Sequence, residues 1–144
     1  MTQRCIYALK AILELASRAG SAPVKIQEIA DAQQIPIRFL ESILNELRRG
    51  GFVESRRGYI GGYLLARPAA ELSVGEVIEF IEGPVELNFK VKTEDAPSRS
   101  SFALDKFWGL VAGNMKKVYD TTTFEDLAIW EQAADIKATN NYVI

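Results

Sequence analysis

The apolar residues of the N-terminal half recur at the three- and four-residue spacing of amphipathic helices. Residues 3–19 carry one such stripe, and Gly20 follows it as a plausible helix end. The stripe consists of Ile6, Leu9, Leu13 and Ala16, and is broadened by Ile12 and Leu15. This pattern predicts a core helix.

A second and a third amphipathic segment follow at short intervals. Residues 25–33 place Ile26, Ile29 and Ala30 on one side, and the sequence Q-Q-I-P ends this segment. Pro36 then stands where proline is tolerated, in the first turn of a longer helix over residues 36–51. A short helix, a tight turn and a second amphipathic helix predict a helix-turn-helix.

The segment 36–51 has two chemically different faces. The face expected to be buried carries Phe39, Leu40, Ile43, Leu44 and Leu47. The opposite face carries Arg38, Glu41, Ser42, Asn45 and Arg48. Long polar side chains of this kind can hydrogen-bond base edges in a DNA major groove, whereas an isolated helix with the same pattern is more often simply solvated.

A glycine-rich basic stretch follows directly. Residues 52–55 and 63–66 have the pattern of two strands, and the loop between them contains Arg56, Arg57 and three glycines. The glycine spacing matches neither a P-loop nor a dinucleotide fingerprint, and strands flank the loop on both sides. We therefore predict a β-hairpin wing beside the helix-turn-helix.

The rest of the chain predicts further helices around a connector. Ser73 and Glu76 form a capping box for a short helix that ends at Gly83. Residues 85–91 alternate as a half-buried strand does, residues 93–101 have the composition of a loop, residues 102–119 form a long helix, and Thr123 caps a last one. We expect a DNA-binding domain over 1–83, a connector over 84–101, and a dimerisation helix with a C-terminal helix and tail over 102–144.

The long helix over 102–119 has more apolar surface than its own chain needs to cover. Gly109 and Gly113 would permit another helix to approach it closely, although each glycine costs ~1 kcal/mol in a helix interior. These features predict a packed interface with a partner. The candidate interface residues are Phe107, Trp108, Val111 and Met115.

Charge separates the two halves of the chain, whose net charge is only -2. Residues 1–70 hold 10 basic and 6 acidic residues, whereas residues 71–144 hold 7 and 13. A basic N-terminal half suits contact with phosphates. Arg48, Arg49 and Arg56 are the candidate phosphate contacts, and solubility is the alternative explanation for each of them.

Cysteine and histidine, which commonly bind metals or take part in catalysis, are nearly absent from the sequence. The sequence has one cysteine and no histidine, which excludes an intramolecular disulfide and a zinc site of the Cys/His kind, and no catalytic constellation can be assembled. Cys5 lies beside Arg4 in the first turn of a helix, where a lowered pKa would make it a redox sensor, although a quiet buried thiol is the alternative. Without a secretory core or a ~20-residue apolar run, we expect a cytoplasmic protein with no membrane contact.

Several motifs in family order resemble the bacterial Rrf-type winged-helix transcription regulators, which include IscR, NsrR and CymR. They are Y-A-L-K-A-I-L-E-L-A at 7–16, I-Q-E-I-A at 26–30, F-L-E-S-I-L-N-E-L-R-R-G-G at 39–51, S-R-R-G-Y-I-G-G-Y-L-L-A at 55–66, S-V-G-E-V-I at 73–78, Trp108, and T-T-F-E-D-L at 122–127. The resemblance implies a two-fold dimer that binds operator DNA through the recognition helix and wing.

The resemblance also implies roles for single residues. Arg38, Phe39 and Glu41 match positions that the family uses at DNA, and Arg57 matches the wing arginine that enters the minor groove. Position 38 is often small and polar in relatives, and many carry G-P-G-G-G-Y in the wing where this chain has G-Y-I-G-G-Y. The operator sequence therefore cannot be inferred from a relative.

The largest departure concerns iron. Cluster-binding relatives carry three closely spaced cysteines before the long helix, whereas residues 90–101 contain none, so the chain resembles a member without an iron-sulfur cluster or other cofactor. Cys5 with Glu94 and Asp95 could form only a fragment of an unusual site, because such clusters are held by several thiolates.

Two classes of function follow from these observations. The leading one is a dimeric DNA-binding repressor of an imperfect palindromic operator. The alternative is a protein-interaction module with weak or no DNA binding, since CymR-like members work with a partner enzyme of cysteine synthesis. A small-molecule effector, a protein partner and oxidation of Cys5 all fit as the signal.

Overall fold

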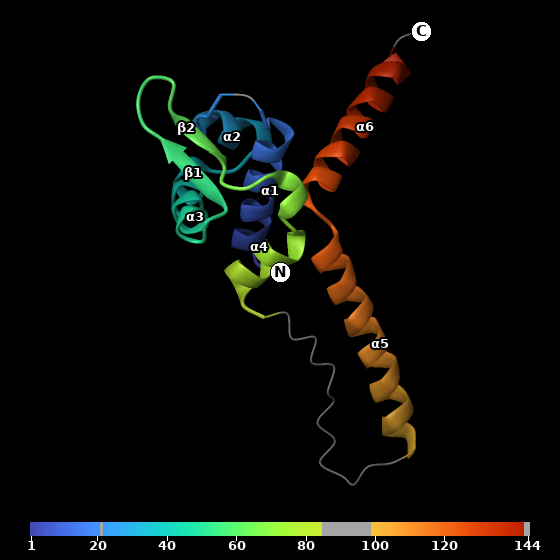
Figure 1. The fold of residues 1–144 in the computed structure, drawn as a ribbon. Coiled ribbons are helices and arrows are strands. Elements are labelled where there is room, and N and C mark those ends of the chain that lie inside the picture. Colours follow the sequence, from blue (N-terminus) through green and yellow to red (C-terminus); the bar gives the residue numbers. More distant parts are fainter. Residues whose placement is uncertain (21, 85–98, 143–144) are drawn as a thin grey trace.

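The fold is mainly helical with one small hairpin (Figure 1), as predicted. The structure is a computed structural model that describes residues 1–20, 22–84 and 99–142. In chain order its elements are α1 (Gln3–Ser17), α2 (Ile26–Gln33), α3 (Ile37–Arg49), β1 (Val53–Arg56), β2 (Gly62–Leu65), the 3-10 turn η1 (Ala69–Glu71), α4 (Val74–Glu82), α5 (Arg99–Thr121) and α6 (Phe124–Tyr142).

Helix α1 is the centre of the folded body, because α2, α3, α4, α6 and β2 all contact it. Its most buried residues are Cys5, Ala8, Ala11, Ile12, Leu15 and Ala16. The predicted stripe was therefore displaced by part of a turn, since Ile6, Leu9 and Leu13 are only half-buried. The small alanines let neighbouring helices approach α1 closely, and the larger residues fill the margins of these contacts.

The predicted helix-turn-helix is confirmed in α2 and α3. Helix α2 ends at Gln33, its C-cap Gln34 has a left-handed backbone with φ 53°, and α3 follows after Ile35 and Pro36. Pro36 is the N-cap of α3 and so lies just before the helix, where its missing N–H costs no helical hydrogen bond. The chain thus turns sharply within two residues.

The hairpin is an antiparallel pair in which Val53 faces Leu65 and Arg56 faces Gly62. Its second strand is also tied to the residue before α2, because Val24 and Tyr63 exchange two backbone hydrogen bonds of 2.8 Å. A Cβ at Gly62 would lie 2.5 Å from the Val24 carbonyl oxygen, so this close approach requires glycine. The wing is therefore fixed to the helix-turn-helix.

The helices of the C-terminal half begin and end close to the predicted positions. The Ser73–Glu76 capping box at α4 is present, with the Glu76 N–H donating to Ser73 Oγ at 3.2 Å and the Ser73 N–H to the Glu76 carboxylate at 2.9 Å. Helix α5 begins at Arg99, so the last three residues of the predicted 93–101 loop are helical. The predicted strand over 85–91 lies outside the described residues.

Helix α6 joins the N-terminal core through its first turn. Thr123 caps it by accepting a hydrogen bond from the Asp126 N–H at 3.1 Å, as predicted, and the Phe124 side chain is 0% exposed as part of the hydrophobic core. The core that we assigned to residues 1–83 thus includes a residue from the C-terminal segment.

Beyond this junction, α5 and α6 diverge from the body as two arms (Figure 1). Large apolar side chains on both arms are exposed: Phe102, Leu104, Phe107, Leu110, Val118, Ile129, Trp130 and Ile136. Within the described residues, none of the helices has the length and apolar character needed to cross a membrane.

Candidate nucleic-acid interface

Helix α3 packs one face into the body and leaves the other in solvent. Leu40, Ile43, Leu44 and Leu47 are buried as predicted, which fixes the rotation of the helix about its axis. The candidate DNA contacts of α3 are all exposed, namely Arg38, Glu41, Ser42, Asn45, Arg48 and Arg49. The structure therefore brings these six side chains onto the outer surface of α3.

Phe39 does not belong to the buried face on which we placed it. Its side chain is 46% exposed, with its ring 6.3 Å from the ring of Tyr7 on α1. The Arg38 guanidinium lies over the same ring, 4.7 Å from its centroid. This cation–π contact limits the freedom of the Arg38 side chain at the start of α3. Phe39 is thus both a platform for Arg38 and an accessible contact itself.

The basic residues differ in how far they are already paired. Arg48 and Arg49 lie in the last turn of α3, where the helix dipole favours a cation. Arg56 forms an ion pair of 3.1 Å with Glu54, which DNA phosphates would have to displace. Arg57 has no ion-pair partner within the part of the chain that the structure describes. Within the described residues, Arg56 is thus the one of these four arginines that has an ion-pair partner.

The tip of the wing adds residues that we did not select from the sequence. Tyr59 and Ile60 are 93% and 79% exposed, and the ammonium group of Lys25 lies 5.4 Å from the centre of the Tyr59 ring. The sequence did contain a signal for these two residues, because large apolar side chains stand between the glycines of a hairpin loop where polar residues are usual. The position of Lys25 beside the loop could be found only from the fold.

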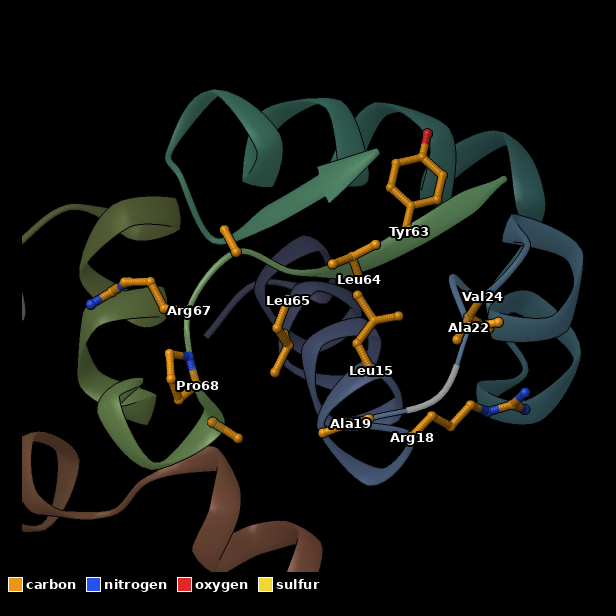
Figure 2. A pocket seen from close by; sticks show the side chains of 13 residues that line it. Leu15, Arg18, Ala19, Ala22, Val24, Tyr63, Leu64, Leu65, Arg67 and Pro68 are labelled. Atoms are coloured by element: carbon orange, nitrogen blue, oxygen red, sulfur yellow. The ribbon is translucent and has the colours of Figure 1, made fainter. Parts of the chain in front are cut away.

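An open pocket of about 420 Å³ lies at the base of the wing (Figure 2). Leu15 on α1, Val24 before α2, and Tyr63 and Leu65 on β2 line it. Arg18 and Arg67 lie at its margins and already pair with Glu14 at 2.8 Å and Glu76 at 3.2 Å. The pocket therefore offers mainly apolar surface.

The pKa of the Cys5 thiol is shifted in the direction opposite to the one that we predicted. The Cys5 side chain is 0% exposed, and burial, with a contribution from the Glu82 carboxylate, raises the pKa of the thiol from 9.0 to about 11. The positive N-terminal amino group acts in the other direction but does not prevent the rise. The predicted lowering of the pKa by Arg4 and the helix dipole is wrong, because desolvation of the thiolate dominates.

The family model of Rrf2, described as an iron-dependent transcriptional regulator, matches residues 1–129. The chain belongs to the Rrf2 family. It is a family of transcriptional regulators and not of enzymes, as we predicted from the absence of a catalytic constellation. Transcription regulation through binding of DNA is the activity that membership supports.

Characterised relatives and solved structures agree with this assignment. The chain is 34% identical to the protein rrf2 of Nitratidesulfovibrio vulgaris, covering 88% of this chain and 85% of that protein. It is 32% identical to the regulator CymR of Bacillus subtilis, covering 85% of this chain and 84% of CymR. The CymR structure superposes with a TM-score of 0.76 over 90% of this chain and 96% of that one, at 29% identity. The structure of IscR of T. potens superposes with a TM-score of 0.74, covering 93% of this chain and 89% of that one, at 28% identity.

The raised pKa of Cys5 predicts a slowly reacting thiol. Iodoacetamide reacts with the thiolate, so alkylation followed by mass spectrometry should be slow at pH 8 and should accelerate only as the pH approaches 11. Protein unfolded in urea is the control and should react readily near pH 9. Rapid alkylation of the folded protein at pH 8 would contradict the burial of the thiol.

The same shift predicts how stability depends on pH. The folded pKa lies above the unfolded one, so the stabilisation is complete below pH 9 and is lost as the pH rises towards 11. The free energy of unfolding of the wild type, minus that of Cys5→Ala, should fall across this interval. Subtracting the variant removes the titration of the lysines and tyrosines that both proteins share. A constant difference would show that the pKa of Cys5 does not change on folding.

Proposed function

We propose that this protein is a homodimeric, sequence-specific DNA-binding repressor that acts in the cytoplasm on an imperfect palindromic operator. The observation that carries the proposal is the exposed polar face of α3 beside a wing that bears Arg57, in a chain of the Rrf2 family. Two such modules related by a two-fold axis would present their α3 helices to major grooves about 10 bp apart, or a multiple of that. The two-fold symmetry of the dimer would then match the symmetry of the operator.

In this proposal the residues of α3 divide into two groups. Arg38, held over the Phe39 ring, has the donor pattern for the O6 and N7 acceptors of guanine, and Glu41 can accept a hydrogen bond from cytosine N4. Ser42 and Asn45 follow on the same exposed face. Arg48 and Arg49, one to two turns further along, are placed to neutralise phosphates and so give affinity without sequence preference.

The wing has the complementary role. Arg57 is exposed and needs to give up no ion pair within the described residues, so it is suited to the negative potential of a narrow minor groove. Arg56 would exchange Glu54 for a phosphate. Because the Val24–Tyr63 hydrogen bonds fix the wing relative to α2, the minor-groove contact would set the register of α3 in the adjacent major groove.

The second part of the proposal is that α5 pairs with α5 of a second copy. One face of the helix carries the four candidate interface residues Phe107, Trp108, Val111 and Met115. Counted from Phe107, the other three follow after one, four and eight residues, which keeps them on the same side of an α-helix. Phe107 is about half exposed, and it packs against Trp108 with ring centroids 4.9 Å apart. Apolar surface continues along both arms, and exposed patches of this extent usually mark an interaction site.

The third part is that the regulator works without an iron-sulfur cluster, although the family description names iron. The sequence supplies one cysteine and no histidine, and Cys5 is buried with a raised pKa, so the donor set does not fit a cluster held by several thiolates. Glu94 and Asp95 lie outside the described residues. Protein purified without oxygen should be colourless, and visible charge-transfer absorption with stoichiometric iron would refute this part.

The proposal is tested by selecting DNA from a pool of random duplexes with the full-length protein. Recovery of a two-fold symmetric motif is expected, and recovery of no preferred sequence would refute sequence-specific binding. This outcome would favour the alternative in which the protein acts through a partner enzyme.

The selected duplex then separates base contacts from phosphate contacts. Arg38→Ala should lose about 1–3 kcal/mol of binding free energy and relax the preference at one base position. Arg48→Ala is the matched variant, and it should weaken all sequences alike and reduce the salt dependence by about one charge. Titrations against the selected duplex, its single-base variants and random DNA at several salt concentrations provide the measurement. If Arg38→Ala weakened all duplexes equally, Arg38 would be a phosphate contact.

The dimer is tested by placing a charge on the proposed contact face of α5. Trp108→Asp should convert the dimer into monomer or aggregate, because an unpaired carboxylate would be buried between apolar side chains. Lys106→Asp is the control, since residue 106 lies on the opposite side of the same helix. Light scattering gives the mass of each variant. A clean dimer of Trp108→Asp would contradict the assignment of this face.

A further inference from the structure

The wing ends in a tight turn whose two corner residues are large and apolar. The Gly61 N–H donates a hydrogen bond to the Gly58 carbonyl at 3.0 Å, which closes a four-residue β-turn. Tyr59 and Ile60 are the two central residues of this turn, with exposed fractions of 93% and 79%. Single exposed apolar residues are common on protein surfaces, so the exposure alone assigns no role.

Two cationic side chains near the turn indicate which kind of molecule the tip would bind. Arg57 comes two residues before Tyr59 in the sequence, and the Lys25 ammonium group lies 5.4 Å from the centre of the Tyr59 ring. The apolar tip is therefore flanked by cations from two different segments of the chain. A polyanion with an apolar interior complements this arrangement, because its phosphates can meet Lys25 and Arg57 while bases and sugars meet the tip.

The tip is also continuous with the surface proposed to bind DNA. The hairpin loop projects from the body beyond β1 and β2 (Figure 1), and Arg56 and Arg57 lead directly into it. The strand that follows the loop is anchored to Val24 through two hydrogen bonds of 2.8 Å. An insertion of the tip into DNA would therefore be supported by a fixed base.

We propose that Ile60 is an apolar wedge that enters the minor groove and partly separates one base step next to the Arg57 contact. Proteins that bend DNA insert isoleucine, leucine or phenylalanine in this way and kink the duplex. Pyrimidine–purine steps such as TA separate most easily. Ile60 would thus select a flexible step at a position where Arg57 reads only the width of the groove. The inference rests on the proposed function, because it requires the wing to meet DNA.

The experiment uses the full-length protein and the duplex that the wild type selects from random DNA. Ile60→Ser removes the apolar side chain, whereas Ile60→Leu retains an apolar wedge of equal size and is the matched control. Affinity is measured at several salt concentrations, and the end-to-end distance of the duplex is followed by energy transfer between dyes at its two ends. Thermal melting establishes that both variants are folded.

The wedge predicts a specific combination of results. Ile60→Ser should bind the selected duplex about tenfold more weakly, with an unchanged salt slope, and should bend it less than the wild type does. Ile60→Leu should retain both the affinity and the bend. Replacing the pyrimidine–purine step at the wing position by AA should weaken the wild type about tenfold but leave Ile60→Ser nearly unaffected.

Two outcomes would overturn the wedge while leaving the proposed function intact. In the first, Ile60→Ser binds and bends the selected duplex as the wild type does, which would assign the exposed tip to something other than DNA. In the second, Ile60→Ser changes the salt slope, which would mean that residue 60 acts only by positioning Lys25 or Arg57. Failure of the wild type to select any duplex would overturn both proposals.

Discussion

The close packing of α1 determines the positions of most of the other elements. Helices α2, α3, α4 and α6 and strand β2 contact this one helix, and its buried face contains Ala8, Ala11 and Ala16 where larger side chains would keep the neighbours apart. Four residues of α3 complete the core, namely Leu40, Ile43, Leu44 and Leu47. This inner face of α3 fixes which of its side chains point outwards. The proposed base contacts are therefore a consequence of apolar packing on the other side of the same helix.

A second constraint couples the wing to this core. The Val24–Tyr63 pair joins the hairpin to the segment before α2, and Gly62 permits the approach because it has no side chain. The helix-turn-helix and the wing thus form one unit in which α3 and the loop cannot be repositioned independently. Such preorganisation reduces the ordering cost of binding, which is the usual advantage of a rigid recognition surface.

The sequence alone predicted the elements whose signals are local. Helical periodicity indicated α1 to α4, and the Ser73–Glu76 capping box located the start of α4 correctly. The features that were missed depend on tertiary neighbours. Small alanines displaced the buried face of α1, and Phe39 lies half-exposed beside Tyr7 and Arg38 rather than in the core. For Cys5, burial and Glu82 reversed the expected direction of the pKa shift. The candidate interface was therefore largely predictable, whereas the contribution of Lys25 and the wing tip was not.

The central claim is that DNA contacts the outer face of α3 and the wing together. Amide chemical shifts of the isotope-labelled protein, followed by nuclear magnetic resonance during titration with the selected duplex, test it most directly. The largest changes are expected at exposed positions of α3, including residues 38, 42 and 45, and at residues 56–62. Changes that centre on α5 and α6, with α3 and the wing unaffected, would contradict it.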